Sequence, residues 1–311
     1  MLKIKDLNTG VRINETYLVS NVTSGVSNNG QPYLTVTLQD NSGQIDAKVW
    51  AATKEDFASF VPGNIVRVIA DVQEYRSSLQ LKIVSYTVED VKKYDLEEFV
   101  MSSVRTHAEL EGELDEVLAS FKNEDVSKII NHLFSTLKEN FLTFPAATRN
   151  HHEYVGGLAE HTLSMVEVGE FMASHYNDVN RDLLIAGILI HDLGKMIELS
   201  GPLLTEYTKK GKLLGHISIG SAIILETANE LSIESEVPIL LAHMILSHHG
   251  KLEFGSPVLP MTKEAYLLST IDNLDSKMNI IDKALSTTEP GEFSDRMWAL
   301  DNISFYKSEE E

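Results

Sequence analysis

The chain of 311 residues contains no cysteine. This absence excludes disulfide bonds and thiolate zinc sites, and it is typical of proteins from the reducing cytoplasm. Long apolar runs are also lacking, because the longest, residues 183–190, is far shorter than the roughly 20 residues of a transmembrane helix. The amino-terminal MLKIKDLNTG carries charges where a signal peptide needs apolar residues. We therefore expect a cytoplasmic protein that does not enter a membrane.

Basic residues are few, with 26 Lys and Arg against 46 Asp and Glu, and the net charge is -20. This balance argues against nucleic-acid binding by the chain as a whole, because phosphates require a basic surface. The charge is uneven, however: the first 90 residues hold 8 basic and 10 acidic side chains, so most of the negative charge lies beyond them. The later acidic residues form either an ordinary solvated surface or a group of carboxylates around bound cations.

Residues 1–90 show short alternating stretches separated by turn residues, which is the pattern of β-strands. Strands are expected in YLVSNVTSGV, QPYLTVTLQD and QIDAKVW, a short helix in ATKEDFASF, and two further strands in NIVRVIADVQEY and LQLKIVSY. Five strands with a helix between the third and fourth is the order of an OB-fold barrel. The stretch YLTVTLQDNSGQIDAKVW resembles the second and third strands of OB-fold nucleic-acid-binding domains.

OB-folds bind single strands with stacking aromatic and basic side chains on one face of the barrel. The candidates for such a face are Tyr33, Lys48, Trp50, Arg67, Tyr75 and Arg76. The alternative is that these residues pack against a neighbouring domain.

Beyond about residue 95 the strand pattern ends and apolar residues recur at helical spacing. Helices are expected near residues 107–121, 124–140, 158–176, 181–193, 216–231, 235–248 and 261–285. Residues 91–106 are predicted to be a linker, and residues 107–311 an all-α domain.

All 11 histidines lie in the helical part. Those that stand in apolar stretches or at their ends, together with two aspartates, are His161, His191, Asp192, His216, His248, His249 and Asp272. A single buried histidine is usually a hydrogen-bonded core residue, but this set of imidazoles and carboxylates suits Mn²⁺, Fe²⁺, Co²⁺, Ni²⁺ or Zn²⁺. The ligands are too many for one ion and indicate a pair of ions bridged by a carboxylate.

His191 and Asp192 directly follow the apolar run LLIAGILI. They should therefore sit at the inner end of a core element, where an unpaired charge is costly. Either a salt-bridge network or a bound metal ion can compensate this charge. We expect the metal pair, and not a counter-charge from the protein, to do so.

The order His161, His191-Asp192, Asp272 resembles the motif of the HD-domain metal-dependent phosphohydrolases, and the additional histidines resemble its two-metal form. With the preceding OB-fold, the stretches PAATRNHHEYVGGLAEHT and ILIHDLGK resemble the YhaM family of bacterial 3′→5′ exoribonucleases. The resemblance implies a multidomain fold, with an OB-fold barrel followed by an HD-type helical domain.

The same resemblance implies how the ligands are shared. One ion would be held by His161, His191, Asp192 and Asp272, and Asp192 would bridge to a second ion held by His216, His248 and His249. Of the last two histidines, one is alternatively a substrate contact.

Further polar residues near the motif are candidates for the reaction. Asp192 and Lys195 are candidate catalytic residues. Lys195 would place its positive charge against the scissile phosphate; the alternative is that it is a surface lysine at a helix end. Arg149, His151 and His152 are candidate phosphate or 3′-end contacts, or else local loop contacts. Asp275, three residues after Asp272, is a candidate partner that orients a ligand histidine.

The leading hypothesis is a metal-dependent 3′→5′ exonuclease that hydrolyses single-stranded RNA, with single-stranded DNA as a further candidate, to nucleoside 5′-monophosphates. Two Mn²⁺ ions are expected, with Co²⁺ or Fe²⁺ as alternatives, and a homo-oligomer is a candidate assembly. One alternative is an HD phosphohydrolase of free or cyclic nucleotides, which would need no strand-binding domain. The other is a nucleic-acid-binding regulatory protein whose metal site is structural and therefore closed.

Overall fold

The computed structural model describes residues 2–27, 29–75, 78–94, 98–100, 103, 105–146, 154–201 and 205–310. The chain divides into two compact units, the first ending at residue 102. The boundary lies inside residues 91–106. Each unit is described by itself below.

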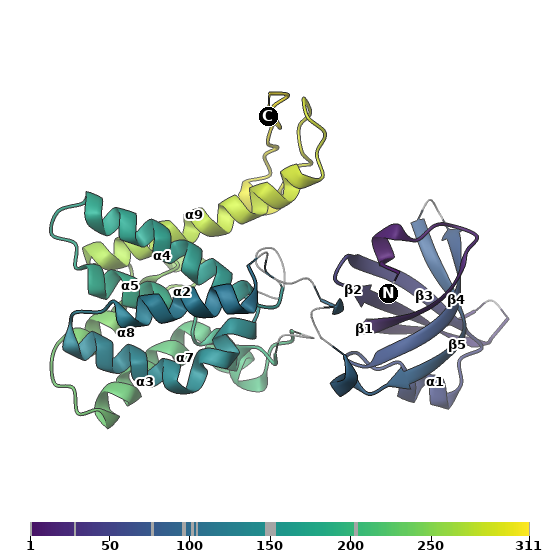
Figure 1. The fold of residues 1–311 in the computed structure, drawn as a ribbon, viewed down its shortest axis with the longest axis horizontal. Coiled ribbons are helices and arrows are strands. Elements are labelled where there is room, and N and C mark those ends of the chain that lie inside the picture. The colour runs from purple at the N-terminus through teal and green to yellow at the C-terminus, as the bar shows by residue number, and fades with distance from the viewer. Residues whose placement is uncertain are drawn as a thin grey trace. The chain divides into compact units, whose positions relative to one another are not determined.

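Five strands form a closed barrel in the first unit (Figure 1). They are β1 (Arg12–Val26), β2 (Pro32–Asp40), β3 (Gly43–Trp50), β4 (Ile65–Tyr75) and β5 (Ser78–Glu89). Their order around the barrel is β1-β2-β3-β5-β4, and the short helix α1 (Lys54–Ser59) stands between β3 and β4 in sequence. The five strands and the place of the helix agree with the sequence prediction.

Alternation along β2 and β3 separates the barrel core from its outer face. Leu34, Val36 and Leu38 on β2 are completely buried. The antiparallel register sets Leu34 opposite Val49, and it sets Tyr33 opposite Trp50. The inner positions therefore fill the barrel, while the outer positions carry the aromatic and polar side chains considered below.

The second unit is helical among its described residues. Its helices are α2 (His107–Ala119), α3 (Glu124–Thr143), α4 (Gly157–His175), α5 (Arg181–Ile190), α6 (Lys195–Glu198), α7 (Lys209–Glu230), α8 (Val237–Ser247) and α9 (Lys263–Ser286). The short helix α6 was not predicted. Helix α7 begins at Lys209, before the predicted start at residue 216, because a helical segment precedes a kink at Gly215.

Helix α5 lies at the centre of this unit. Every residue from Asp182 to Ile190 is buried, and the helix contacts α4, α8 and α9. The apolar run is thus surrounded on all sides, as its composition predicts. Among the helices that the structure describes, none combines the length and the apolar character that crossing a membrane requires.

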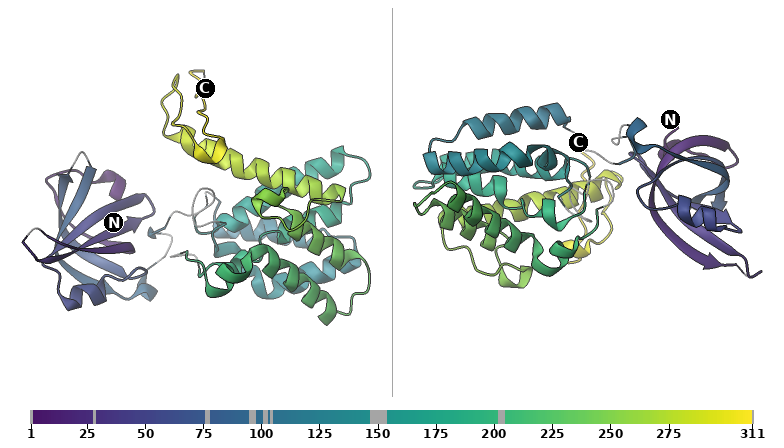
Figure 2. Two further views of the ribbon diagram at one scale, coloured as in Figure 1. Left: turned by 180° about the vertical axis from the view of Figure 1, so that it is seen from behind. Right: turned by 90° about the horizontal axis from the view of Figure 1, so that it is seen from below.

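Beyond α9, residues 287–310 form an arm with the antiparallel bridges Phe293 to Tyr306 and Met297 to Ile303. Figure 2 shows this arm, in yellow, from behind and from below. Single 3₁₀ turns occupy Ile4–Asp6, Val91–Lys93, Leu252–Phe254 and Trp298–Leu300.

The first turn of α5 is tied to the connection between α2 and α3. The Asp182 carboxylate accepts hydrogen bonds from the backbone N–H groups of Lys122 and Asn123, at 2.7 and 2.6 Å. Arg181 Nη1 lies 3.1 Å from the other oxygen. Burial opposes ionisation, but these hydrogen bonds and Arg181 outweigh it and hold the pKa of Asp182 below its ordinary value.

The substitution Asp182→Asn should lower the free energy of unfolding by about 2 kcal/mol at neutral pH, because a charged acceptor of two backbone N–H groups is lost. Since folding lowers the pKa of Asp182, its contribution is complete above about pH 4 and is lost as the pH falls through the folded-state pKa. Urea unfolding at pH 7 and thermal melts from pH 5 to pH 3 should show the difference between the variant and the native protein shrinking in acid.

The matched control is Asp178→Asn, because the Asp178 side chain is 90% exposed. It should change stability by less than about 0.5 kcal/mol. Equal losses in the two variants would contradict the anchoring role of Asp182.

Candidate metal centre and nucleic-acid face

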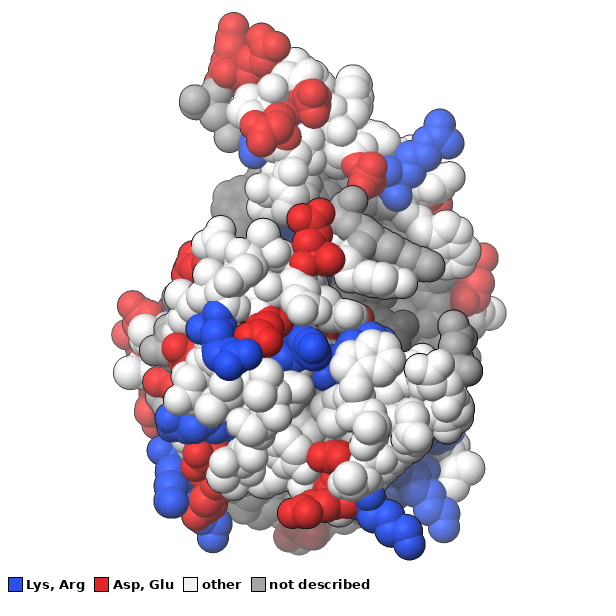
Figure 3. All heavy atoms as spheres, turned by 90° about the vertical axis from the view of Figure 1, so that its right-hand side faces the viewer, with Lys and Arg blue, Asp and Glu red and all other residues white. Residues whose placement is uncertain are grey.

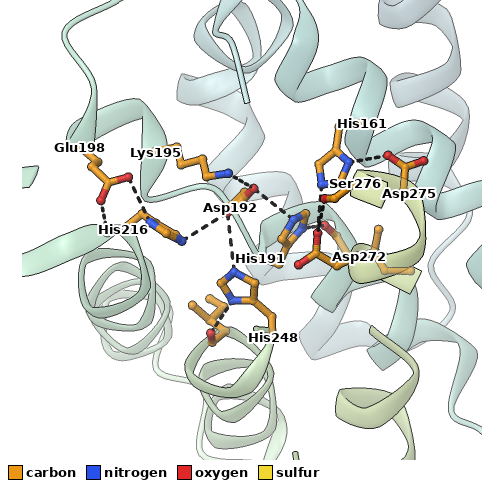
Figure 4. Close-up of polar contacts among 12 residues, drawn as sticks. His161, His191, Asp192, Lys195, Glu198, His216, His248, Asp272, Asp275 and Ser276 are labelled. Atoms are coloured by element: carbon orange, nitrogen blue, oxygen red, sulfur yellow. Dashed lines mark hydrogen bonds and ion pairs between the residues drawn. The ribbon is translucent and has the colours of Figure 1, made fainter. Parts of the chain in front are cut away.

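Imidazole and carboxylate side chains from several helices converge in the second unit, and Figure 4 shows most of them. Helix α4 supplies His161, the end of α5 supplies His191 and Asp192, and α9 supplies Asp272. The others are His216 from α7 and His248 and His249 from the end of α8. The structure thus brings together all seven residues that the sequence singled out as metal ligands.

These residues form two groups that could each hold a cation. In one, ligand atoms of His161, His191 and Asp192 lie within 4.8 Å of one another; in the other, those of His216, His248 and His249 do. Asp272 joins the first group, with Oδ1 3.4 Å from His161 Nε2.

Asp192 lies between the two groups. Its Oδ2 is 3.3 Å from His191 Nε2, and its Oδ1 is 3.5 Å from His216 Nε2 and 3.7 Å from His248 Nε2. Each of the two carboxylate oxygens of Asp192 therefore faces a different group, which is the arrangement that a bridging ligand requires.

Each histidine ring is oriented through its Nδ1. The backbone carbonyls of Ile188, Ile245 and Phe254 lie 2.7–2.8 Å from the Nδ1 atoms of His191, His248 and His249, respectively. A proton on Nδ1 donates to each carbonyl and leaves the Nε2 lone pair directed into the centre. This pairing is typical of histidines that bind a metal through Nε2.

Carboxylates orient the other two rings. His161 Nδ1 lies 2.7 Å from Asp275 Oδ2, and the Ser164 hydroxyl donates to Asp275 Oδ1 at 2.6 Å. His216 Nδ1 lies 3.0 Å from Glu198 Oε2. The predicted pairing of Asp275 with a ligand histidine is observed, and Glu198 has the same role for His216.

Four atoms of the centre are buried without a hydrogen-bond partner among the described residues. They are His191 Nε2, His216 Nε2, His248 Nε2 and Asp192 Oδ1. A buried polar atom that lacks a partner typically costs 1–3 kcal/mol. Because all four are potential ligand atoms that face one another, a bound divalent cation fits the donor set and would satisfy them together.

The expectation that no counter-charge of the protein faces Asp192 is wrong. Lys195, at the start of α6, places Nζ 2.6 Å from Asp192 Oδ2. Burial opposes ionisation of Asp192, but Lys195 and His191 outweigh it and hold the pKa well below its ordinary value. Lys195 faces only one oxygen, however, so Oδ1 is left for the group of His216 and His248.

The histidines of the centre differ in charge. Burial, and then His191, lowers the pKa of His248 to about 3, so this ring is neutral at physiological pH. Burial acts the same way on His161, but hydrogen bonds to Asp272 and Asp275 outweigh it and raise its pKa to about 9. A cation that binds His161 Nε2 must therefore displace a proton.

The predicted nucleic-acid face is assembled only in part. Tyr33 and Trp50 are cross-strand neighbours with ring centroids 5.2 Å apart, and Lys48 Nζ lies 5.1 Å from the Tyr33 ring centroid. Trp50 remains 53% exposed. These three residues form one aromatic and basic surface on the outer face of β2 and β3, which we call the Trp50 surface.

Arg67 lies elsewhere on the barrel. It is on β4, opposite Thr16 of β1 and Thr87 of β5, and its Nε donates to Glu89 at 3.1 Å. Strand β4 therefore does not pair with β2 or β3, and a contact of Arg67 with nucleic acid stays a prediction. Tyr75 is exposed at the end of β4.

Four candidate contacts, Arg76, Arg149, His151 and His152, lie outside the described residues. On the face drawn in Figure 3, the described lysine and arginine side chains are interspersed with acidic ones.

Comparisons with known proteins agree with this fold. Residues 158–277 match the model of the HD domain, and residues 18–89 match that of the OB-fold nucleic acid binding domain. The 3'-5' exoribonuclease YhaM of Geobacillus sp. (strain WCH70) is 44% identical over 299 residues, which cover 96% of this chain and 92% of the relative. This chain belongs to the YhaM family. The family and the predicted order of an OB-fold followed by an HD-type domain are thereby confirmed.

A second relative, the 3'-5' exoribonuclease YhaM of Bacillus subtilis (strain 168), is also 44% identical over 299 residues, with 96% of this chain and 95% of the relative covered. The second OB-fold domain of replication protein A from Methanococcus maripaludis matches 28% of this chain and 93% of its own, at 17% identity and a TM-score of 0.24.

Sequence reasoning missed Glu198 in this YhaM-family chain. Its carboxylate accepts from both the backbone N–H and Nδ1 of His216. A four-residue helix carries no periodic pattern, so the sequence offers no signal for a buried glutamate there. The pKa of Glu198 is lowered because contacts with His216 outweigh the effect of burial.

The absence of a side chain at Gly194 allows the turn between α5 and α6 to pack closely against the backbone of α7. Its backbone angles, φ -61 and ψ -20, are open to any residue, but a Cβ there would lie 2.1 Å from the His216 carbonyl oxygen. The substitution Gly194→Ala should therefore displace His216 and weaken Mn²⁺ binding by about 10- to 100-fold. Isothermal titration of the chelator-treated protein with Mn²⁺ measures the effect.

The control for this substitution is Gly112→Ala in α2, where an added Cβ meets nothing within 4 Å. It should leave Mn²⁺ affinity unchanged and stabilise the helix by about 0.5–1 kcal/mol. Native Mn²⁺ affinity in Gly194→Ala would show that the contact does not position His216.

The Trp50 surface yields a binding prediction. If a nucleobase stacks on Trp50, Trp50→Ala should weaken single-stranded RNA binding by about 1–3 kcal/mol. Fluorescence anisotropy with labelled RNA in the presence of chelator measures this without hydrolysis. Trp298→Ala is the control because Trp298, on the C-terminal arm, is 91% exposed. Equal dissociation constants for the Trp50 variant and the native protein would exclude stacking at this position.

Proposed function

We propose that this chain is a 3′→5′ exoribonuclease whose activity depends on a pair of divalent cations. The observation that carries the proposal is the set of four buried ligand atoms that face one another and have no hydrogen-bond partner in the described part of the chain. Membership of the YhaM family supports the direction of hydrolysis and single-stranded RNA as the substrate.

The proposed ligands divide at Asp192. His161, His191, Asp192 and Asp272 would hold one cation, and His216, His248 and His249, together with Asp192, would hold the other. The distances of the two Asp192 oxygens to the two groups support this division. Mn²⁺ is the proposed ion, with Co²⁺ or Fe²⁺ as alternatives, because imidazole and carboxylate ligands without thiolates suit these metals.

When bound, such cations activate water for attack on phosphorus and neutralise the charge that develops on the phosphoryl oxygens. The chain itself fixes the geometry. The carbonyls and carboxylates on the Nδ1 atoms prevent the rings from turning, and α5 holds His191 and Asp192 in a buried position. Lys195 supplies an ammonium group at the same place, which we assign to the scissile phosphate.

The reaction breaks the bond between phosphorus and the 3′-oxygen of the penultimate nucleotide. That oxygen takes a proton and becomes the new 3′ end, while the 3′-terminal nucleotide leaves as a nucleoside 5′-monophosphate. The surface of Tyr33, Lys48 and Trp50 favours a strand over a free nucleotide as substrate, because a free nucleotide needs no second binding unit. Single-stranded DNA as a further substrate, a homo-oligomeric state and a cytoplasmic location stay predictions.

The direct test uses single-stranded RNA labelled at its 5′ end and chelator-treated protein. Added Mn²⁺ should produce a ladder of progressively shorter labelled products. Asp192→Asn should reduce the rate by about 100-fold or more, because it removes the charge shared by both ligand groups. Asp178→Asn, which changes an exposed carboxylate outside the ligand set, is the control and should retain native activity.

Two other outcomes would point away from an exoribonuclease. RNA that binds to the protein but stays intact with every added divalent ion would indicate a binding protein with a structural metal. Hydrolysis of free nucleotides alone would indicate a nucleotide phosphohydrolase. Immediate release of a labelled mononucleotide would show that hydrolysis starts at the 5′ end, which would contradict the proposed 3′→5′ direction.

A further inference from the structure

The first turn of α7 is strongly basic although the part of the chain beyond residue 90 is acidic overall. Lys209, Lys210 and Lys212 are all exposed. Among the described residues none of the three has an acidic partner. By contrast, Lys138 and Lys263 of the same unit are ion-paired. We call Lys209, Lys210 and Lys212 the basic turn.

The basic turn has an unfavourable charge arrangement in the free protein. Three ammonium groups within four residues repel one another. An anionic ligand would relieve this repulsion.

The backbone of the basic turn is joined to the metal centre through Glu198. Gly211, between Lys210 and Lys212, is buried against it: a Cβ on Gly211 would lie 2.3 Å from the Glu198 carbonyl oxygen. The Thr208 N–H also donates to that oxygen, at 2.8 Å. The Glu198 side chain in turn holds His216.

This connection gives the basic turn a definite place. Consecutive Cα atoms are 3.8 Å apart, so Lys210 and Lys212 originate immediately beside the Gly211–Glu198 contact. In Figure 4, Glu198 and His216 stand at one end of the row of ligands, and His161 and Asp275 stand at the other. The basic turn therefore adjoins the His216 end of the centre.

We propose that Lys209, Lys210 and Lys212 bind backbone phosphates of the RNA strand on the 5′ side of the scissile bond, so that the strand approaches the centre from its His216 end. The inference rests on the proposed function, because in a 3′→5′ exonuclease only the terminal phosphodiester is at the metals. Every other phosphate then lies on the 5′ side, and these are the anions that the basic turn would meet.

The test compares Lys210→Gln/Lys212→Gln with Lys128→Gln/Lys263→Gln, which removes the same charge from exposed lysines elsewhere in the unit. Hydrolysis of a 20-nucleotide RNA and of a dinucleotide with Mn²⁺ is measured over a range of salt concentrations. The basic-turn variant should raise KM for the longer RNA about fivefold or more. Its loss of kcat/KM should be larger on the longer RNA than on the dinucleotide.

Salt dependence provides an independent readout. For single strands, the logarithm of the binding constant falls linearly with the logarithm of the salt concentration. The slope of this line changes by about 0.7 for each phosphate contact. The slope for the longer RNA should therefore become less steep in the basic-turn variant and stay native in the control variant.

Equal losses on both substrates would overturn the proposal, because they would show that the substitutions act through Glu198 and His216. A native KM on the longer RNA would overturn it as well. Failure of the proposed function looks different: the unsubstituted protein itself would leave both substrates intact with Mn²⁺.

Discussion

The structure of the helical unit depends on one buried charge. Asp192 is 4% exposed, at the end of a helix that is apolar on every side. An ionised carboxylate in such a place needs positive partners, and among the described lysines and arginines Lys195 alone pairs with it, through Oδ2. The other oxygen and three imidazole nitrogens are left for a cation. Helix packing, ring orientation and metal binding are therefore parts of a single arrangement.

The two units differ in charge. The barrel is close to neutral and presents Tyr33, Lys48 and Trp50 on its outer face, the residue types on which OB-folds stack bases and bind phosphates. The helical unit carries the acidic excess, and its cations would reverse the local field where the substrate is cut. An overall charge of -20 is thus compatible with a polyanionic substrate.

Local patterns in the sequence predicted what depends on local structure. Alternation at Leu34, Val36 and Leu38 indicated the inner face of the barrel, and the run before His191 indicated a buried helix. What the sequence did not reveal depends on tertiary approach. The contact of Lys195 with Asp192, the support of His216 by Glu198, and the separation of Arg67 from the Trp50 surface each require knowing how turns and strands close in space.

The orientation of the histidine rings has an evolutionary consequence. His191, His248 and His249 are held by main-chain carbonyls, which persist whatever side chain occurs at positions 188, 245 and 254. His161 and His216 depend instead on the carboxylates of Asp275 and Glu198. Substitutions at these three positions can therefore accumulate without changing the orientation of the first three rings. Substitution of Asp275 or Glu198, in contrast, would remove the group that orients His161 or His216.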